Sequence, residues 1–162
     1  MRRHLSVQLT ILAASMALTA CGGSPTAPSN TVDFQGVWQG TWQRTSCTET
    51  GGAQGAACSQ TPSSGTLRLT LTQTGTAVQG SAEILALLIP SSGMVGSSGT
   101  LALNGQTHIG GQASGTFSLS NWSTTRSGNA MAGTFTLTFV ADDPALGTET
   151  LQLTLQSVTK TS

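Results

Sequence analysis

Charged side chains are scarce in this sequence, and their scarcity limits the partners it can have. Lys, Arg, Asp and Glu make up 7% of the 162 residues, with six basic and six acidic side chains. Two of the basic residues belong to a leader that we expect to be removed, which leaves four basic against six acidic side chains, a net charge of −2. Four scattered basic residues provide no electrostatic surface for DNA or RNA. We therefore expect no nucleic-acid partner.

Residues that usually carry acid–base catalysis are also few. The chain has no tyrosine, one lysine and, outside the leader, one histidine, His108. A Ser-His-Asp triad would need His108 together with Asp33, Asp142 or Asp143, because an imidazole must take the serine proton. The sequence contains no G-x-S-x-G element to hold such a serine. We predict that the protein is not an enzyme, that it uses no cofactor, and that His108 is an exposed strand residue.

Three carboxylates lie close together in the sequence at Asp142, Asp143 and Glu149, with Pro144 and Gly147 between them. Oxygen ligands of this kind bind Ca²⁺, but the spacing fits no calcium motif. Asp beside Pro and Gly is common in turns. We interpret the segment as a solvated turn and predict no metal site.

Sustained helical periodicity is missing, and alternation with a period of two residues takes its place. The segment 66–72 puts three leucines on one face of a strand and Arg68, Thr70 and Thr72 on the other. Similar alternation marks strands at 33–44, 77–85, 99–103, 108–120, 131–140 and 148–159, with turns expected at Gly75, Asn104-Gly105 and 127–129. The pattern predicts an all-β fold, an antiparallel up-and-down meander of about eight strands closing into a small barrel, with a β-sandwich as the alternative.

One apolar segment leaves its structure open at this stage. Residues 84–89 are mostly apolar and precede Pro90, so they fit an extended strand, a short helix, or an apolar loop forming a lip at the barrel mouth. Glu83 falls on the strand face opposite Ile84, and we predict that its carboxylate lies outside the barrel.

The first 23 residues carry the strongest motif in the chain. Two arginines precede an apolar run over residues 5–17, and Leu18-Thr19-Ala20-Cys21 is followed by two glycines. The pattern resembles the signal sequence and lipobox of bacterial lipoproteins, in which the cysteine is acylated and becomes the first mature residue. The resemblance implies a signal peptide at 1–20, a lipid anchor at Cys21 and a place in the cell envelope, at the outer membrane in a Gram-negative host. Residues 21–30 are expected to form the lipidated start and a flexible tether, and residues 31–162 a single barrel domain.

Two cysteines remain once Cys21 is assigned to the anchor. Cys47 and Cys58 flank a polar and glycine-rich segment that has little else to hold it, and an exported chain reaches a compartment where disulfides persist. A metal pair is the alternative, although the separation of the two residues is not a zinc spacing. We predict a Cys47–Cys58 disulfide.

The first strand carries the short motifs Gly36-Val37-Trp38 and Gly40-Thr41-Trp42. With the meander that fills most of residues 31–160, they give the chain a resemblance to calycin-type barrels, the group of lipocalins and avidins. In lipocalins the tryptophan of G-x-W packs at the closed end of the barrel, and the resemblance implies that role for Trp38 or Trp42. The last strand has no arginine to cover this ring, and Trp122 is the counterpart left for the tryptophans that avidins place in later strands.

These observations lead to two functional hypotheses. In the first, the barrel binds a small apolar ligand, with Phe34, Trp38, Trp42 and Trp122 as the contacts. In the second, the chain is a non-catalytic protein-interaction or envelope-structural module that meets an envelope protein, and its barrel is filled by its own side chains. A void on the order of several hundred Å³ would favour the ligand, and a filled interior would favour the protein partner.

Overall fold

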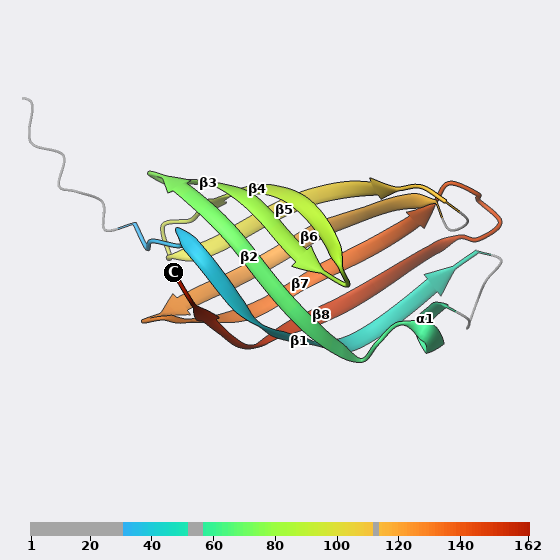
Figure 1. Cartoon of the computed structure of the whole chain (residues 1–162), viewed down its shortest axis with the longest axis horizontal. Helices are drawn as coiled ribbons and strands as arrows, with labels where there is room; N and C mark the ends of the chain where they lie inside the picture. Colours follow the sequence, from blue (N-terminus) through green and yellow to red (C-terminus); the bar gives the residue numbers. More distant parts are fainter. Residues whose placement is uncertain (1–30, 52–56, 112–113) are drawn as a thin grey trace, which may run out of the picture.

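The computed structural model describes residues 31–51, 57–111 and 114–162, which form a closed barrel of antiparallel strands (Figure 1). Each strand pairs with the next along the chain, and β1 also pairs with β8. The eight strands are β1 (Gly36–Thr50), β2 (Ser64–Thr74), β3 (Ala77–Ile84), β4 (Leu87–Val95), β5 (Thr100–Ile109), β6 (Gly115–Ser127), β7 (Ala130–Ala141) and β8 (Thr148–Lys160). The predicted all-β meander and its closure into a barrel are confirmed, and the architecture is consistent with a calycin-like barrel.

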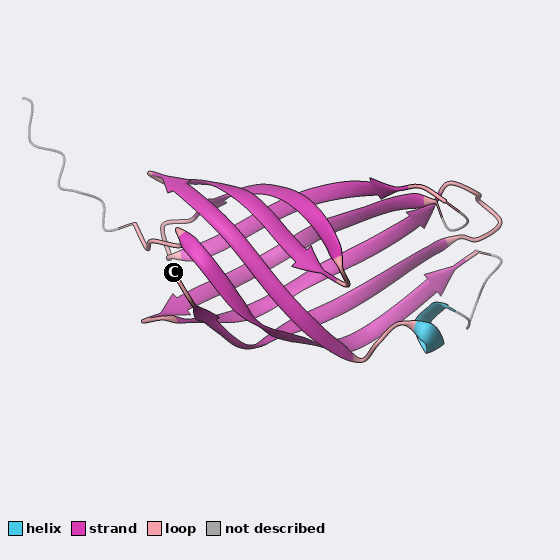
Figure 2. Ribbon diagram, viewed as in Figure 1, coloured by secondary structure: helices cyan, strands magenta, loops and turns pink. Residues whose placement is uncertain are grey.

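A short helix, α1 (Ala57–Gln60), lies between β1 and β2 (Figure 2). Within the described ranges, no helix has the length and apolar character needed to span a membrane. The predicted signal peptide at 1–20, the acylated Cys21 and the tether up to residue 30 lie outside the described residues.

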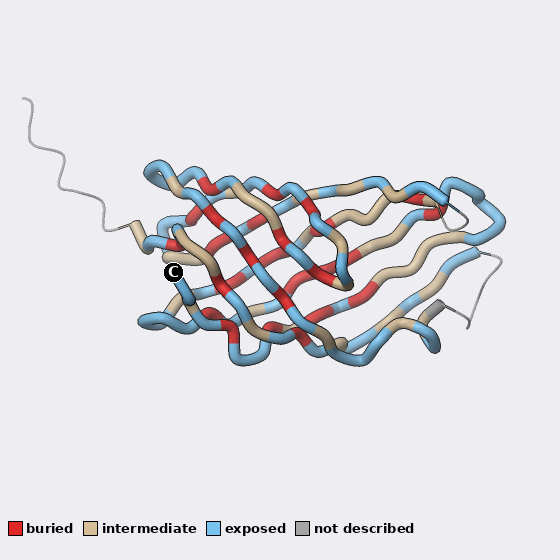
Figure 3. Tube along the Cα trace, viewed as in Figure 1, coloured by how far each residue is buried: buried red, intermediate tan, exposed pale blue. Residues whose placement is uncertain are grey.

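Alternation along each strand separates the core from the surface. In β2 the side chains of Leu67, Leu69 and Leu71 are buried, while Arg68 and Thr70 between them are exposed. Buried and exposed residues alternate in the same way along much of the wall (Figure 3). Because successive side chains of a strand point to opposite faces, the leucines of β2 and β8 and the aromatic residues of β1 meet inside the barrel.

The sequence prediction of a turn at Asn104-Gly105 is wrong, because both residues lie inside β5. Neither has a positive φ, and Gly105 pairs with Ser91 of β4 and with Leu119 of β6. A Cβ at Gly105 would lie 2.4 Å from the Pro90 carbonyl oxygen, so the glycine permits a close approach of two strands. The real connection from β5 to β6 follows Ile109.

The segment 84–89, whose structure the sequence left open, contains a tight hairpin turn between β3 and β4. Leu85 and Ala86 form the turn with φ values of 54° and 61°, as a two-residue turn of the I′ type requires. Ile84 and Ile89 on either side are buried, whereas Leu88 is 61% exposed. The segment is therefore a strand end, a turn and a strand start.

The barrel wall is uneven in height. β3 and β4 have 8 and 9 residues, whereas β1, β6, β7 and β8 have 12 to 15. We call the end that holds residues 31–35 and 160–162 the terminal end, and the end that holds α1 the helix end. At the helix end, the long strands extend beyond the β3–β4 hairpin (Figure 1). Near this end, one edge of β1 extends beyond its pairing with β2, and one edge of β5 extends beyond its pairing with β4.

Candidate functional site

The terminal end is closed by aromatic residues of the first strand and of the segment before it. Trp38 and Phe34 are fully buried, with ring centroids 6.4 Å apart. The Trp38 indole Nε1 donates a hydrogen bond to the Phe34 carbonyl oxygen at 2.8 Å, and the Phe34 amide donates to Gln73 Oε1 at 2.7 Å. Trp38 thus lies at a closed end of the barrel, where the resemblance to lipocalins places a tryptophan.

Arg126 at the end of β6 covers the Trp38 ring. Its guanidinium carbon lies 5.5 Å from the ring centroid, and its nitrogens donate to the carbonyl oxygens of Gly128 and Asp33. The Asp33 carboxylate lies 3.9 Å from both Arg126 Nη1 and Lys160 Nζ. Sequence reasoning searched the last strand for this arginine and missed it in β6, although Arg126 shares the inward parity of Trp122.

The four residues expected to contact a ligand are packed into the core. Phe34, Trp38, Trp42 and Trp122 have exposures of 0%, 0%, 1% and 2%. Trp122 stacks on Phe135 with ring centroids 4.7 Å apart. The indole N–H groups are satisfied, with Trp42 donating to the Thr66 carbonyl at 3.1 Å and Trp122 to Thr124 Oγ1 at 3.0 Å. A ligand touching these rings would have to displace side chains that already cover them.

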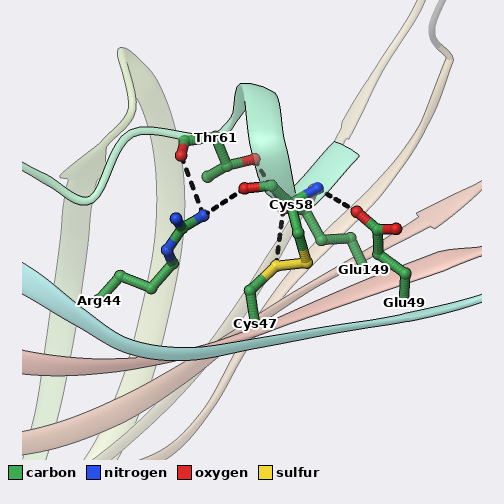
Figure 4. Close-up of a disulfide and its surroundings, with 6 residues drawn as sticks. All are labelled: Arg44, Cys47, Glu49, Cys58, Thr61 and Glu149. Carbon is green, nitrogen blue, oxygen red and sulfur yellow. Dashed lines mark hydrogen bonds between the residues drawn. A yellow bond between two sulfur atoms is a disulfide. The ribbon is translucent and has the colours of Figure 1, made fainter. Parts of the chain in front are cut away.

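The predicted disulfide joins Cys47 of β1 to Cys58 of α1, with Cα atoms 5.8 Å apart. Arg44 Nη1 donates to the carbonyl oxygens of Cys58 and Thr61 at 2.7 and 2.9 Å, and the Cys58 amide donates to the Glu49 carboxylate (Figure 4). These contacts fasten the α1 segment over the part of β1 that runs beyond its pairing with β2. Among the described residues, Cys47, Glu49 and Cys58 are the group with metal-ligand geometry, but the disulfide occupies both sulfur atoms.

A small hollow opens inside the helix end. Its volume is about 70 Å³, and Leu85, Phe117, Phe139 and Glu149 line it together with Thr61. The Glu149 carboxylate points inward from β8 and accepts a hydrogen bond from Thr61 Oγ1 at 2.6 Å. Ligand pockets usually measure about 300 to 1,000 Å³, so this hollow has room for only a few atoms.

The three neighbouring carboxylates of the sequence do not converge. Glu149 belongs to β8, whereas Asp142 and Asp143 lie in the exposed turn before it, where Asp143 Oδ1 accepts the Ala145 amide at 2.9 Å. The prediction of a turn is confirmed for these two residues. Sequence reasoning missed the inward orientation of Glu149, which the alternation with Leu151 could have shown.

His108 is exposed on β5, as predicted, and its Nε2 lies 3.0 Å from Asp142 Oδ2. Two hydrogen bonds lower the pKa of the Asp142 carboxyl: the one from His108 has the larger effect, and the one from the Ser114 hydroxyl has the smaller. Ser114 therefore meets the carboxylate, whereas in a catalytic triad the serine bonds to the imidazole. Glu83 also lies outside the barrel, as predicted, in register with Arg68.

A larger cleft of about 750 Å³ lies where β4 and β5 separate, and we call it the fork cleft. Its lining includes Gln79, Pro90, Ser92, Asn104, Gln106 and Ser118. None of the lining side chains is charged. Sequence reasoning did not find this cleft, although a proline within an apolar strand was its available signal.

Comparisons with protein-family models, with curated proteins and with solved structures give no significant match to this chain.

Proposed function

We propose that this chain is a lipid-anchored lipoprotein of the bacterial cell envelope that acts by binding another envelope protein. The anchor is Cys21, and the proposal draws on the lipobox at residues 18–21. The binding module is the barrel, and the protein is not an enzyme. Of the two hypotheses drawn from the sequence, the protein-interaction module gains the stronger support.

The observation that carries this choice is the burial of the barrel interior. The three tryptophans at positions 38, 42 and 122 are at most 2% exposed. A void beside these rings that was large enough for a water molecule would leave part of their surface accessible. Interiors packed in this way resemble ordinary protein cores. Recognition then falls to the outer surface, where the largest cleft described above also lies.

Native mass spectrometry of the full-length protein, extracted from the membranes of its own host, tests the proposal. An added protein mass, together with an acyl modification on the N-terminal peptide beginning at Cys21, is the expected result. A co-purifying small molecule with no protein partner would instead favour the ligand-binding hypothesis. An unmodified Cys21 would show that the proposed lipid anchor is wrong.

A further inference from the structure

The barrel wall splits between β4 and β5. Their ladder runs from Val95↔Leu101 to Ser91↔Gly105 and stops there. Beyond this point β5 continues to Ile109, paired with β6 alone, and β4 continues to its hairpin with β3. The ladder's end coincides with the fork cleft.

Backbone alternation shows which groups face the split. The Gly96 amide bonds to the Thr100 carbonyl at 2.8 Å, so alternate residues of β4 below it, down to Pro90 and Leu88, direct their backbone groups toward β5. Pro90 has no N–H, so it cannot donate the bond that would continue the ladder. Since the last bridge is Ser91↔Gly105, its flanking bond uses the Gln106 amide and the Pro90 carbonyl, and the alternation leaves the Gln106 carbonyl and both backbone groups of His108 at the open edge of β5.

The corresponding edge of β1, unlike that of β5, is covered by another segment. β1 also outruns its neighbour, since its ladder with β2 ends at Gln43↔Ser64. There the α1 segment covers the edge, because the Arg44 amide donates to the Ser63 carbonyl at 2.8 Å and the disulfide holds Cys58 in place. No described segment covers the matching edge of β5. Proteins normally protect strand edges, and an edge left open is ready to pair with another chain.

The chemistry of the fork selects the kind of chain that would fit. Its lining offers amides and hydroxyls and no charge, so a charged side chain buried there would lack a partner. On the inner face of the open edge, Thr107 and Ile109 are half-buried. Leu88, on the opposite side of the split, is largely exposed. An extended segment with alternating apolar and small polar residues matches this surface.

We propose that the fork binds an extended, uncharged segment of a partner protein, which adds as a strand to the open edge of β5 at Gln106 and His108. This inference rests on the proposed function and specifies its binding surface. The backbone bonds supply affinity, and the alternating side chains supply selectivity, as in other cases of strand addition.

A peptide of about eight residues, the usual length of a strand, that alternates valine with threonine or serine is the probe. We expect it to bind the purified full-length protein in fluorescence anisotropy, and we expect the same peptide with alternate amides N-methylated not to bind. In the Pro90→Val variant the restored N–H allows the β4–β5 ladder to continue past residue 90. The edge of β5 is then occupied, and peptide binding should weaken at least about tenfold. The matched control is Thr159→Val, an exposed position on β8 away from the fork cleft, which should bind as the wild type does. Equal binding by both variants would overturn the proposal.

Amide hydrogen exchange gives a second readout that needs no peptide. In the free wild-type protein the His108 and Leu88 amides should exchange faster than those of Thr107 and Ile89, and Pro90→Val should protect them. Slow exchange at His108 in the free wild type would overturn the open edge, as would a dimer that masks it. If the partner found in the host membranes still binds Pro90→Val at full strength, strand addition is wrong while the protein-interaction function stands. If no partner is found, that function itself is wrong.

Discussion

Replacing Trp42 by alanine distinguishes a filled barrel from one with a ligand cavity. Trp42 is 1% exposed, and its ring is so closely surrounded that a Cβ added at Gly65 would lie 2.6 Å from its Cζ2 atom. Truncating a large buried aromatic side chain costs about 3–5 kcal/mol, because apolar contacts are lost and a cavity remains. The Thr66 carbonyl also loses the indole N–H that donates to it. For a domain of this size, the melting temperature should fall by about 10–20 °C.

Urea unfolding followed by the fluorescence of the two remaining tryptophans measures this loss. Gln43→Ala, an exposed position on the same strand, is the matched control and should change stability by less than about 0.5 kcal/mol. Free indole should raise the melting temperature of Trp42→Ala, since it can fill the new cavity, and should leave the wild type unchanged. A loss below about 1.5 kcal/mol with an unchanged denaturant slope would refute the filled interior, because it would mean that the ring already borders empty space.

Three further predictions concern other parts of the barrel. Replacing Cys47 and Cys58 together by serine should lower the free energy of unfolding by about 2.8 kcal/mol, the entropic cost of closing a loop with a sequence separation of 11, and adding a reductant should bring the wild type to the same value. Asp142→Asn should flatten the pH dependence of the unfolding midpoint on the acid side. The hydrogen bond from His108 lowers the folded-state pKa below the ordinary value of 3.8, so its stabilisation is complete above that pH and is lost as the pH falls through the folded value. Arg126→Met should cost about 1–2 kcal/mol in urea unfolding, because its guanidinium no longer covers an indole ring, and a variant as stable as the wild type would exclude that contact as a stabilising one.

Alternation in the sequence predicted the strands because it records which face of each strand is buried. The leucines of 66–72 needed no knowledge of their neighbours to be assigned to one face. Closure of the sheet was harder to derive, since the same parity serves a sandwich or a barrel, and the pairing of β1 with β8 is a long-range property. The fold class was therefore predictable, while the choice of barrel depended on the strand count.

The turns show where local signals fail. Asn-Gly is a strong hairpin signal, yet Asn104-Gly105 lies within a strand. Glycine is needed at position 105 because Pro90 and Ser91 of the neighbouring strand leave no room for a Cβ. Conversely, the turn between β3 and β4 at Leu85-Ala86 has positive φ at both residues, but neither leucine nor alanine usually signals such a turn. In each case contacts distant in sequence outweighed the local preference.

The candidate surface could be predicted only in part for the same reason. Aromatic residues on one face of β1 fit a core and a ligand pocket equally well, and only packing separates the two. The fork cleft depends on the height of β3 and β4 relative to their neighbours, which no single segment encodes. Pro90 marks the place, but its meaning follows from the strand that fails to pair with it.

The bond between the first and last strands also governs when the molecule can assemble. Thr41 Oγ1 donates to the Gln156 carbonyl across a separation of 115 residues, so the seam is sealed only after nearly the entire polypeptide has emerged. Such distant contacts make folding slow, and until the barrel closes the sheet has two unpaired strand edges that can aggregate. Until β8 is complete the chain can therefore form only an open sheet, whose first and last strands each present an unpaired edge.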